Sequence, residues 1–202
     1  MLKAKIAVLV SGGGTNLQAI IDAQHSGVIR SGEVVLVISN NANAYALTRA
    51  ENAGIEHLYI SKKELKTQEA FEDAIIAALE EREIDLIVLA GFMSILSERF
   101  TARFDHRILN VHPSLIPSFC GQGYYGLRVH EAALEKGVKV TGATVHFVNE
   151  IPDGGEIIAQ KAVEILDGDT PEVLQKRVME QAEWIILPQS VEKIAKQILD
   201  NR

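Results

Sequence analysis

Short apolar runs that alternate with helix-like segments constrain the fold of this chain more than any other feature of its sequence. The run KIAVLVS (Lys5–Ser11) has the length and branched content of a buried strand, and TNLQAIIDAQHSG, which ends at Gly27, has the apolar spacing of a helix. The same alternation continues to about residue 112. Strands buried on both faces and joined by helical crossovers form parallel sheets. The sequence therefore predicts an α/β fold: an open, twisted, mostly parallel sheet with helices on both faces.

The remaining elements of the N-terminal half follow the same alternation. Strands are expected at Glu33–Asn40, Glu56–Ile60, Asp85–Ala90 and Arg107–His112. Helices are expected in an alanine-rich segment that ends near Gly54, over Thr67–Arg82, and over Ser97–Phe104.

The pattern changes after His112. A loop rich in glycine and aromatic residues (118–126) precedes a helix over 127–137, and two runs (140–148 and 156–165) predict an added antiparallel pair of strands. Thr170 is expected to cap a long C-terminal helix in which Pro171 is the first residue. We expect one domain over residues 1–202, divided into halves of about 1–105 and 106–202.

Composition excludes several classes of protein. The 202 residues carry a formal net charge of -7, which argues against a surface that coats nucleic acid. The single cysteine, Cys120, excludes an internal disulfide and fits a reducing compartment. The apolar N-terminal run is too short for a membrane span and lacks a signal-peptide cleavage site. We expect a cytoplasmic protein with neither membrane nor nucleic-acid partners.

Three glycines, Gly12 to Gly14, stand between the first strand and the first helix. Glycines allow close approach of a ligand, and the start of a helix offers free N–H groups to an anion. Thr15 and Asn16 stand where a P-loop needs lysine and a hydroxyl residue, and the third glycine of a dinucleotide fingerprint is absent. Two interpretations remain: a tight turn with Thr15 or Asn16 as N-cap, or a monophosphate site made by Gly14, Thr15 and Asn16.

The stretch RILNVHPSLIPSF presents Asn110 and His112 at the end of a strand that Pro113 stops. The two side chains point to the same face and lie at the carboxyl edge of a parallel sheet, where ligands bind. An amide donor beside an imidazole suits acyl transfer to an amine, because one group stabilises an oxyanion and the other moves protons. A capped strand end is the alternative interpretation.

Asp153, between Pro152 and two glycines, is a candidate partner for His112. An ordinary Asp-Gly turn explains the same residues. If the fold brings Asp153 to His112, the carboxylate should favour the imidazolium and make His112 an acid near neutral pH.

Four segments resemble one family closely. NVHPSLIPSF, VLVSGGGTNLQAII, AGFMSILS and GATVHFVNEIPDGGEII are similar to phosphoribosylglycinamide formyltransferases, and the match runs from about Ile6 to Pro188. Methionyl-tRNA formyltransferases and formyltetrahydrofolate deformylases share the Asn-x-His-Pro and Asp-Gly-Gly elements, whereas the N-terminal loop indicates the glycinamide ribonucleotide branch. The resemblance implies a Rossmann-like formyltransferase fold with a nucleotide-phosphate half followed by a folate and catalytic half.

The resemblance also implies an activity. The formyl group of 10-formyltetrahydrofolate, a co-substrate, passes directly to the amine of glycinamide ribonucleotide in purine biosynthesis, through a tetrahedral intermediate and without a metal. Its partners are these two small molecules, and a monomer or homodimer is expected.

The implied site residues fall into groups. They are catalytic His112, Asn110 and Asp153; phosphate-binding Gly14, Thr15 and Asn16; and folate-binding Met93, Ser94, Ile95, Leu96 and Asn110. His146 is implied to lie just behind the site, and Glu183 is implied to approach the nucleotide.

Four features depart from the family pattern. Ser94 and Gln68 replace arginines, which leaves a folate role for Gln68 doubtful, and Trp184 stands where histidine is usual. The loop 118–126, which contains Cys120, is longer than in the best-known members. We expect this loop to be mobile and to close over the folate.

Two other functions remain as alternatives. A deformylase-like hydrolase would act on the same folate. That family carries an additional N-terminal domain, and the tRNA enzymes carry a C-terminal one; we expect neither here. A non-catalytic nucleotide-binding protein would explain the glycine loop but not Asn110, His112 and Asp153.

Overall fold

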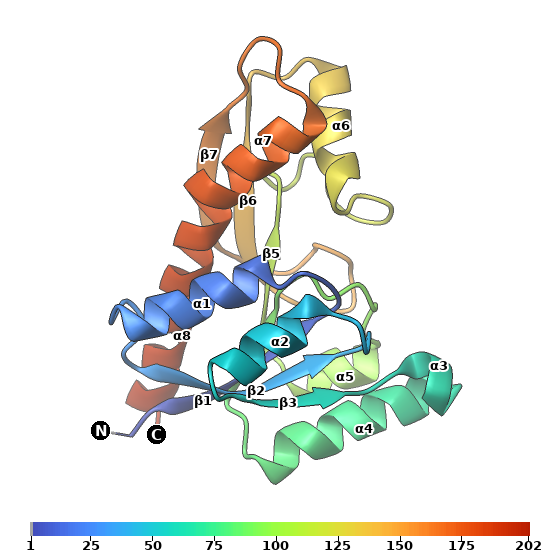
Figure 1. Ribbon diagram of the computed structural model, residues 1–202, viewed down its shortest axis with the longest axis vertical. Helices are drawn as coiled ribbons and strands as arrows, with labels where there is room; N and C mark the ends of the chain where they lie inside the picture. The colour runs from blue at the N-terminus through green and yellow to red at the C-terminus, as the bar shows by residue number, and fades with distance from the viewer. Residues whose placement is uncertain (1) are drawn as a thin grey trace.

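A single seven-stranded sheet organises residues 2–202, the part of the chain that the computed structural model describes (Figure 1). The strands are β1 (Ala4–Val10), β2 (Gly32–Ser39), β3 (Glu56–Tyr59), β4 (Leu86–Leu89), β5 (Ile108–His112), β6 (Val140–Phe147) and β7 (Ile157–Glu164). Their order is β3-β2-β1-β4-β5-β6-β7. The first five are parallel, and β6 is antiparallel to both β5 and β7. The predicted mostly parallel sheet with an antiparallel addition is confirmed.

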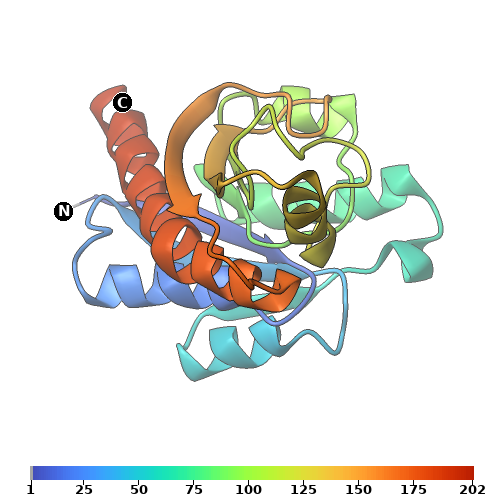
Figure 2. The same cartoon turned by 90° about the horizontal axis from the view of Figure 1, so that it is seen from above.

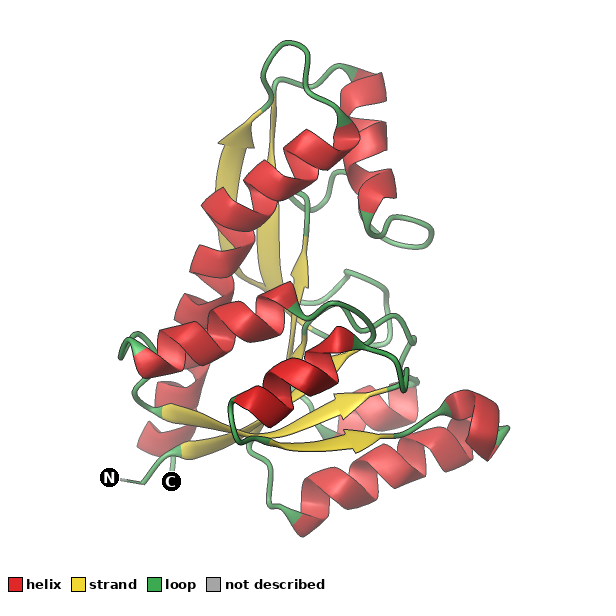
Figure 3. Ribbon diagram, viewed as in Figure 1, coloured by secondary structure: helices red, strands yellow, loops and turns green. Residues whose placement is uncertain are grey.

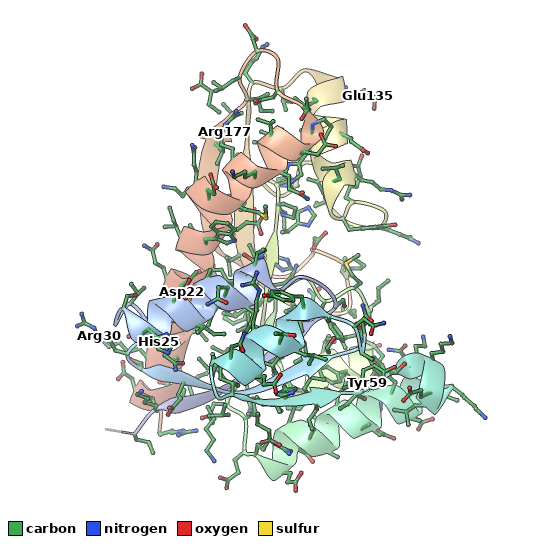
Figure 4. All side chains as sticks on the ribbon, viewed as in Figure 1. Asp22, His25, Arg30, Tyr59, Glu135 and Arg177 are labelled. Carbon is green, nitrogen blue, oxygen red and sulfur yellow. The ribbon has the colours of Figure 1, made fainter. Side chains whose placement is uncertain are left out.

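Helices connect the strands and form the C-terminal end of the chain (Figure 3). They are α1 (Thr15–His25), α2 (Tyr45–Asn52), α3 (Lys62–Leu65), α4 (Gln68–Glu81), α5 (Glu98–Arg103), α6 (Leu127–Lys136), α7 (Pro171–Val178), the π-helical segment η1 (Met179–Glu183) and α8 (Trp184–Asp200). The side chains of Asp22, His25 and Glu135 project outward from α1 and α6 and are exposed (Figure 4).

Two differences from the predicted elements stand out. The short helix α3 was not expected, because four residues are too few to show an apolar period. The C-terminal helix begins as predicted, since the Thr170 side chain accepts a hydrogen bond from Val173 N–H and Pro171 follows it. It then passes through η1, in which π-type bonds replace the α-helical ones, before continuing as α8.

Each face of the sheet buries its own apolar cluster. In β4, Leu86 and Val88 pack with residues of α1, α2, α7 and α8, whereas Ile87 and Leu89 pack with residues of α4 and α5. Figure 1 shows α1 and α2 on one side of β1–β3 and α4 on the other, and Figure 2 views the same layers from above. This alternation explains why the strands contain almost continuous apolar runs.

His130 of α6 is a buried polar residue without an evident partner. It is 0% exposed, and neither ring nitrogen has a hydrogen-bond partner in residues 2–202. Burial, together with the charge of His112, lowers the pKa of His130 to about 4. The unfolded state therefore binds more protons between this value and about 6.5, and the free energy of unfolding contributed by His130 falls as the pH drops through this window.

We predict that His130→Leu weakens the acid sensitivity of the fold. Between pH 7.5 and 4.5 the free energy of unfolding of the wild type should fall by about 2–3 kcal/mol more than that of the variant. Urea unfolding at both pH values measures the difference. Glu183 titrates in the same range with the opposite sign, because its pKa is raised to about 6, but it is present in both proteins and cancels. Equal pH dependence in the two proteins would contradict the prediction.

Candidate active site

Asn110 and His112 leave the same face of β5. Leu109, which precedes them, and Val111, which lies between them, point to the opposite face, into the apolar cluster beneath α1 and α8. Across the antiparallel pair, Asn110 lies opposite His146 of β6, and Asn110 Nδ2 is 3.2 Å from His146 Nε2. The other ring nitrogen, Nδ1, lies 2.7 Å from the carbonyl oxygen of Phe147. Nδ1–H therefore donates to this carbonyl and Nε2 accepts from the amide of Asn110, which orients that amide.

The loop that follows β6 brings Asp153 beside both histidines. Asp153 Oδ2 lies 3.4 Å from His112 Nδ1, and Oδ1 lies 3.5 Å from His146 Nε2. The backbone N–H of Gly121 also donates to Asp153 Oδ2, at 2.8 Å. Asp153 thus joins the end of β5, the strand β6 and the loop 118–126.

Both ring nitrogens of His112 face acceptors. Nε2 is 2.8 Å from the carbonyl oxygen of Phe119, and Nδ1 faces Asp153. Only the imidazolium can donate to both. Burial nevertheless lowers the pKa of His112, since the side chain is 5% exposed, and Asp153 and Phe119 offset only part of this effect. Asp153 acts in the predicted direction, but the net shift of the His112 pKa is downward in the free protein.

The carboxyl of Asp153 is ionised in this arrangement. Burial raises the pKa of this carboxyl, but the neighbouring His146 ring, the charge of His112 and the N–H of Gly121 together outweigh burial, so the net pKa is below its ordinary value. A fixed negative charge therefore faces the imidazole of His112.

The glycine loop is held from behind by α2. The N–H of Ala46 donates to the carbonyl of Gly12 at 3.1 Å, and Arg49 Nε donates to the carbonyl of Gly13 at 2.8 Å. Gly14 is the N-cap of α1, with φ of 72° and no side-chain cap. The interpretation of the loop as a turn capped by Thr15 or Asn16 is therefore wrong. The N–H groups of the first turn of α1 have no capping side chain and can serve an anion.

The π-helical segment contacts the start of α1. Asn16 Nδ2 donates to Glu183 Oε2 at 2.7 Å, and the hydroxyl of Thr15 lies 3.9 Å from the sulfur of Met179. Glu183 is 6% exposed, and burial raises its pKa to about 6 although the hydrogen bond with Asn16 opposes the shift. The Asn16 side-chain N–H is thus directed at Glu183, and the first backbone N–H groups of α1 have no side-chain cap.

A cavity of about 140 Å³ adjoins the catalytic candidates. It is lined by Leu89, Phe92, Ser94, Ile95, Leu96, Asn110, His146, Val148 and residues 149–153. The folate candidates Ser94, Ile95 and Leu96 therefore share one cavity with Asn110 and Asp153. Met93 is not part of its lining; its side chain is 56% exposed, and its N–H donates to the hydroxyl of Ser11 at 2.8 Å.

The two positions that lack arginine make internal contacts. Asn40 Nδ2 donates to the hydroxyl of Ser94 at 2.8 Å. Gln68 Nε2 donates to the carbonyl of Ile95 at 3.0 Å and to Glu72 Oε1 at 2.6 Å. Gln68 thus supports the backbone of the loop 92–96, and Ser94 is held by Asn40 at the end of β2.

The loop 118–126 and Trp184 have contacts of their own. The backbone of this loop contacts His112 through Phe119 and Asp153 through Gly121. Burial and the charge of Asp153 raise the pKa of Cys120, so its thiol is protonated near neutral pH. Trp184 begins α8, and its indole N–H is buried without a partner among residues 2–202. Mobility of the loop and its closure over a folate stay predictions.

The contacts of Ser11, Asn40, Phe119 and Gly121 were not expected from the sequence. Ser11 and Asn40 follow the ends of β1 and β2, and this position is the signal that could have indicated them. Phe119 and Gly121 act through backbone groups, which leave no side-chain signature.

Metal and membrane features complete the description of the site. Within residues 2–202, no three His, Cys, Asp or Glu side chains are grouped to hold a metal ion. In the same part of the chain, no helix combines the length and the apolar content needed to cross a bilayer.

The sheet, the glycine loop and the Asn–His–Asp cluster define a group-transfer enzyme fold with known relatives. The model of the formyl transferase family matches residues 4–191, and the chain belongs to this family. It is 48% identical to the phosphoribosylglycinamide formyltransferase of Haemophilus influenzae, over 91% of this chain and 84% of that protein. The family resemblance read from the sequence is confirmed.

Two further relatives are similar over most of this chain. The human trifunctional purine biosynthetic protein adenosine-3 is 47% identical over 96% of this chain, which spans 18% of the length of that protein. The crystal structure of glycinamide ribonucleotide transformylase 1 from Symbiobacterium toebii superposes with a TM-score of 0.90 at 42% identity, covering 96% of this chain and 89% of that one.

We predict that Gly14→Ala destabilises the glycine loop. A Cβ at this position would lie 2.7 Å from the Cβ of Ala46, and the residue has a positive φ. The free energy of unfolding should fall by about 1–3 kcal/mol. Gly12→Ala is the matched control, because no atom lies within 4 Å of a Cβ there. Urea unfolding compares the two variants, and equal stability would refute the prediction.

We predict that Asp153→Asn lowers the pKa of His112 further. Asp153 is the charge that raises this pKa against burial, so its removal leaves burial less opposed. In the free wild type the His112 signal should titrate below about 6.5 in an NMR titration of labelled histidines, and lower still in the variant. Asp105→Asn, beside the exposed His106, should leave His112 unchanged. A higher or unchanged pKa in Asp153→Asn would contradict the prediction.

Proposed function

We propose that this protein transfers the formyl group of 10-formyltetrahydrofolate to the amine of glycinamide ribonucleotide. The observation that carries the proposal is the convergence of Asn110, His112 and Asp153 beside the cavity under residues 92–96. The names of the relatives support the choice of substrates. Purine biosynthesis is the pathway that the same names suggest.

The reaction follows from the placement of the three side chains. The substrate amine attacks the formyl carbon, a carbon–nitrogen bond forms, and the formyl oxygen becomes an oxyanion. Asn110 donates a hydrogen bond to this oxyanion, and the positive charge of protonated His112 stabilises it. The bond from carbon to the folate nitrogen then breaks, and that nitrogen receives the proton released by the amine, which Asp153 helps to move through water.

Protonation of His112 is coupled to the bound substrates in this proposal. Burial disfavours the imidazolium in the free protein, but Phe119 and Asp153 already offer acceptors to both ring nitrogens. An oxyanion next to the ring adds a negative charge that favours the imidazolium. His112 would therefore become protonated more readily as the tetrahedral intermediate forms, and its charge would stabilise the oxyanion.

The glycine loop is the proposed site of the ribonucleotide phosphate. The N–H groups of Gly14, Thr15 and Asn16 point from the start of α1, which also offers its positive dipole end. Glu183, held by Asn16, supplies a carboxylate at the nucleotide side of the site.

The cavity beside Ser94, Ile95 and Leu96 is the proposed folate site, with Met93 at its exposed end. The chemistry uses 10-formyltetrahydrofolate as co-substrate and needs no metal. Ser94 and Gln68 are uncharged, so neither side chain can form an ion pair with the carboxylates of the folate.

The wider setting of the enzyme is also a proposal. A single cysteine and an acidic composition fit a cytoplasmic protein. We treat residues 1–202 as one domain whose sheet is continuous between the halves at about 1–105 and 106–202, acting as a monomer or homodimer on small molecules only.

One assay tests the function. The protein is mixed with glycinamide ribonucleotide and 10-formyltetrahydrofolate, and the release of tetrahydrofolate is followed. We expect release that depends on the ribonucleotide and yields the formylated product. Release that ignores the ribonucleotide would instead identify a deformylase. Binding of nucleotide without binding of folate would identify a non-catalytic protein.

We predict that His112→Ala and Asp153→Asn each lower kcat by about 100-fold or more, because each removes a group that acts on the reacting atoms. Circular dichroism checks that both variants fold. His57→Ala, which removes an exposed histidine far along the sheet at β3, is the control and should keep wild-type turnover. Near-normal kcat in either site variant would overturn the assignment of its residue.

A further inference from the structure

The proposed folate loop is anchored at consecutive residues. Met93 N–H donates to Ser11, Ser94 accepts from Asn40, and the Ile95 carbonyl accepts from Gln68. The fourth anchor, at Ser97, is a carboxylate from a helix on the face of the sheet. That carboxylate belongs to Glu72 of α4, which the proposed reaction does not use.

Glu72 is 1% exposed, yet it carries a carboxylate in an apolar layer. Its Oε1 accepts from Ser97 N–H at 2.7 Å and from Gln68 Nε2 at 2.6 Å. Its Oε2 accepts from the Ser97 hydroxyl and lies 3.7 Å from a guanidinium nitrogen of Arg99. Neighbours in this layer include Phe71 and Ile75, which are fully buried. A buried carboxylate of this kind persists only when its acceptors are satisfied.

Two of the donors around Glu72 connect it to the folate loop, residues 93–96. Ser97 follows the loop directly and is the N-cap of α5. Gln68, through its second hydrogen bond, holds the carbonyl of Ile95 in the middle of the loop. Glu72 therefore holds the end of the loop directly and the middle of the loop through Gln68.

We propose that Glu72 is a positioning residue for the folate subsite, acting through Gln68 and Ser97 on the backbone of residues 94–97. The proposal rests on the function proposed above. Ile95 is 71% exposed, so the internal packing of its side chain contributes little to holding the loop in place. Loss of the carboxylate leaves the Gln68 amide and both donors of Ser97 without their acceptor, and the Ile95 carbonyl loses its fixed donor.

The expected consequence is selective. The nucleotide loop, residues 12–16, makes no contact with Glu72, so the KM for glycinamide ribonucleotide should stay within about 2-fold of wild type. Loss of hydrogen bonds to a buried charged group should raise the KM for 10-formyltetrahydrofolate by about 10-fold or more in Glu72→Ala. Glu72→Gln keeps one oxygen acceptor for Gln68 and Ser97 N–H, and should return the KM to within about 3-fold of wild type.

A purely structural role for Glu72 predicts a different result. Capping of α5 alone would lower the melting temperature and leave both KM values unchanged below it. Asp73→Ala is the matched control: it removes the next carboxylate of α4, which is exposed and pairs with Arg99. It should change neither KM.

The experiment measures both KM values, kcat and thermal unfolding for the wild type and these variants, together with titration of tetrahydrofolate into the free protein. Gln68→Ala covers the case in which Glu72→Ala does not fold, since it cuts only the link to Ile95 and should raise the folate KM by about 3-fold or more. Unchanged folate KM and unchanged tetrahydrofolate affinity in Gln68→Ala, together with an unchanged folate KM in any folded Glu72→Ala, would overturn the inference. Absence of formyl transfer by the wild type would instead refute the proposed function.

Discussion

The carboxylate of Asp153 is the interaction on which the geometry of the site depends. It accepts from the backbone of the loop 118–126 and faces the imidazoles of His112 and His146, which stand on neighbouring antiparallel strands. His146 in turn orients the amide of Asn110. One negative charge therefore holds together two strands and two loops that are distant in sequence. Its own position is set by backbone with positive φ before two glycines, so the turn that looked ordinary in sequence is also the means of aiming the charge.

Much of the fold could be predicted because its signals are local. The apolar run at residues 5–11 became β1, and Thr67 to Arg82 became α4 with Thr67 as its N-cap. The elements that the sequence did not predict were either too short to show a period or unusual in their hydrogen bonding. A helix of four residues, α3, has no period to detect, and η1 keeps the apolar pattern of an ordinary helix while changing its bonds.

The candidate site was predictable in part for the same reason. Asn110 and His112 lie two residues apart on one strand, so their shared face follows from the pleat. The approach of Asp153 depends on β6 pairing with β5 and on the path of the loop that follows, neither of which is local. The direction of the His112 pKa was missed because it is a balance between an attractive charge, which was considered, and burial by surrounding elements, which only the assembled fold supplies. Backbone acceptors and donors such as Phe119 and Gly121 escape sequence reasoning altogether.

The π-helical segment η1 has a consequence for how such a site can change over time. A π turn accommodates one residue more than an α turn, and the helices on either side keep their own packing against the sheet. Met179 and Glu183, at its two ends, are the residues that meet Thr15 and Asn16. Loss of a single residue here, which turns the π turn into an α turn, would re-aim the Glu183 carboxylate that meets Asn16 and leave the apolar face of α8 in register. A change of length at η1 would therefore alter the contacts with Thr15 and Asn16 and leave the packing of the core unchanged.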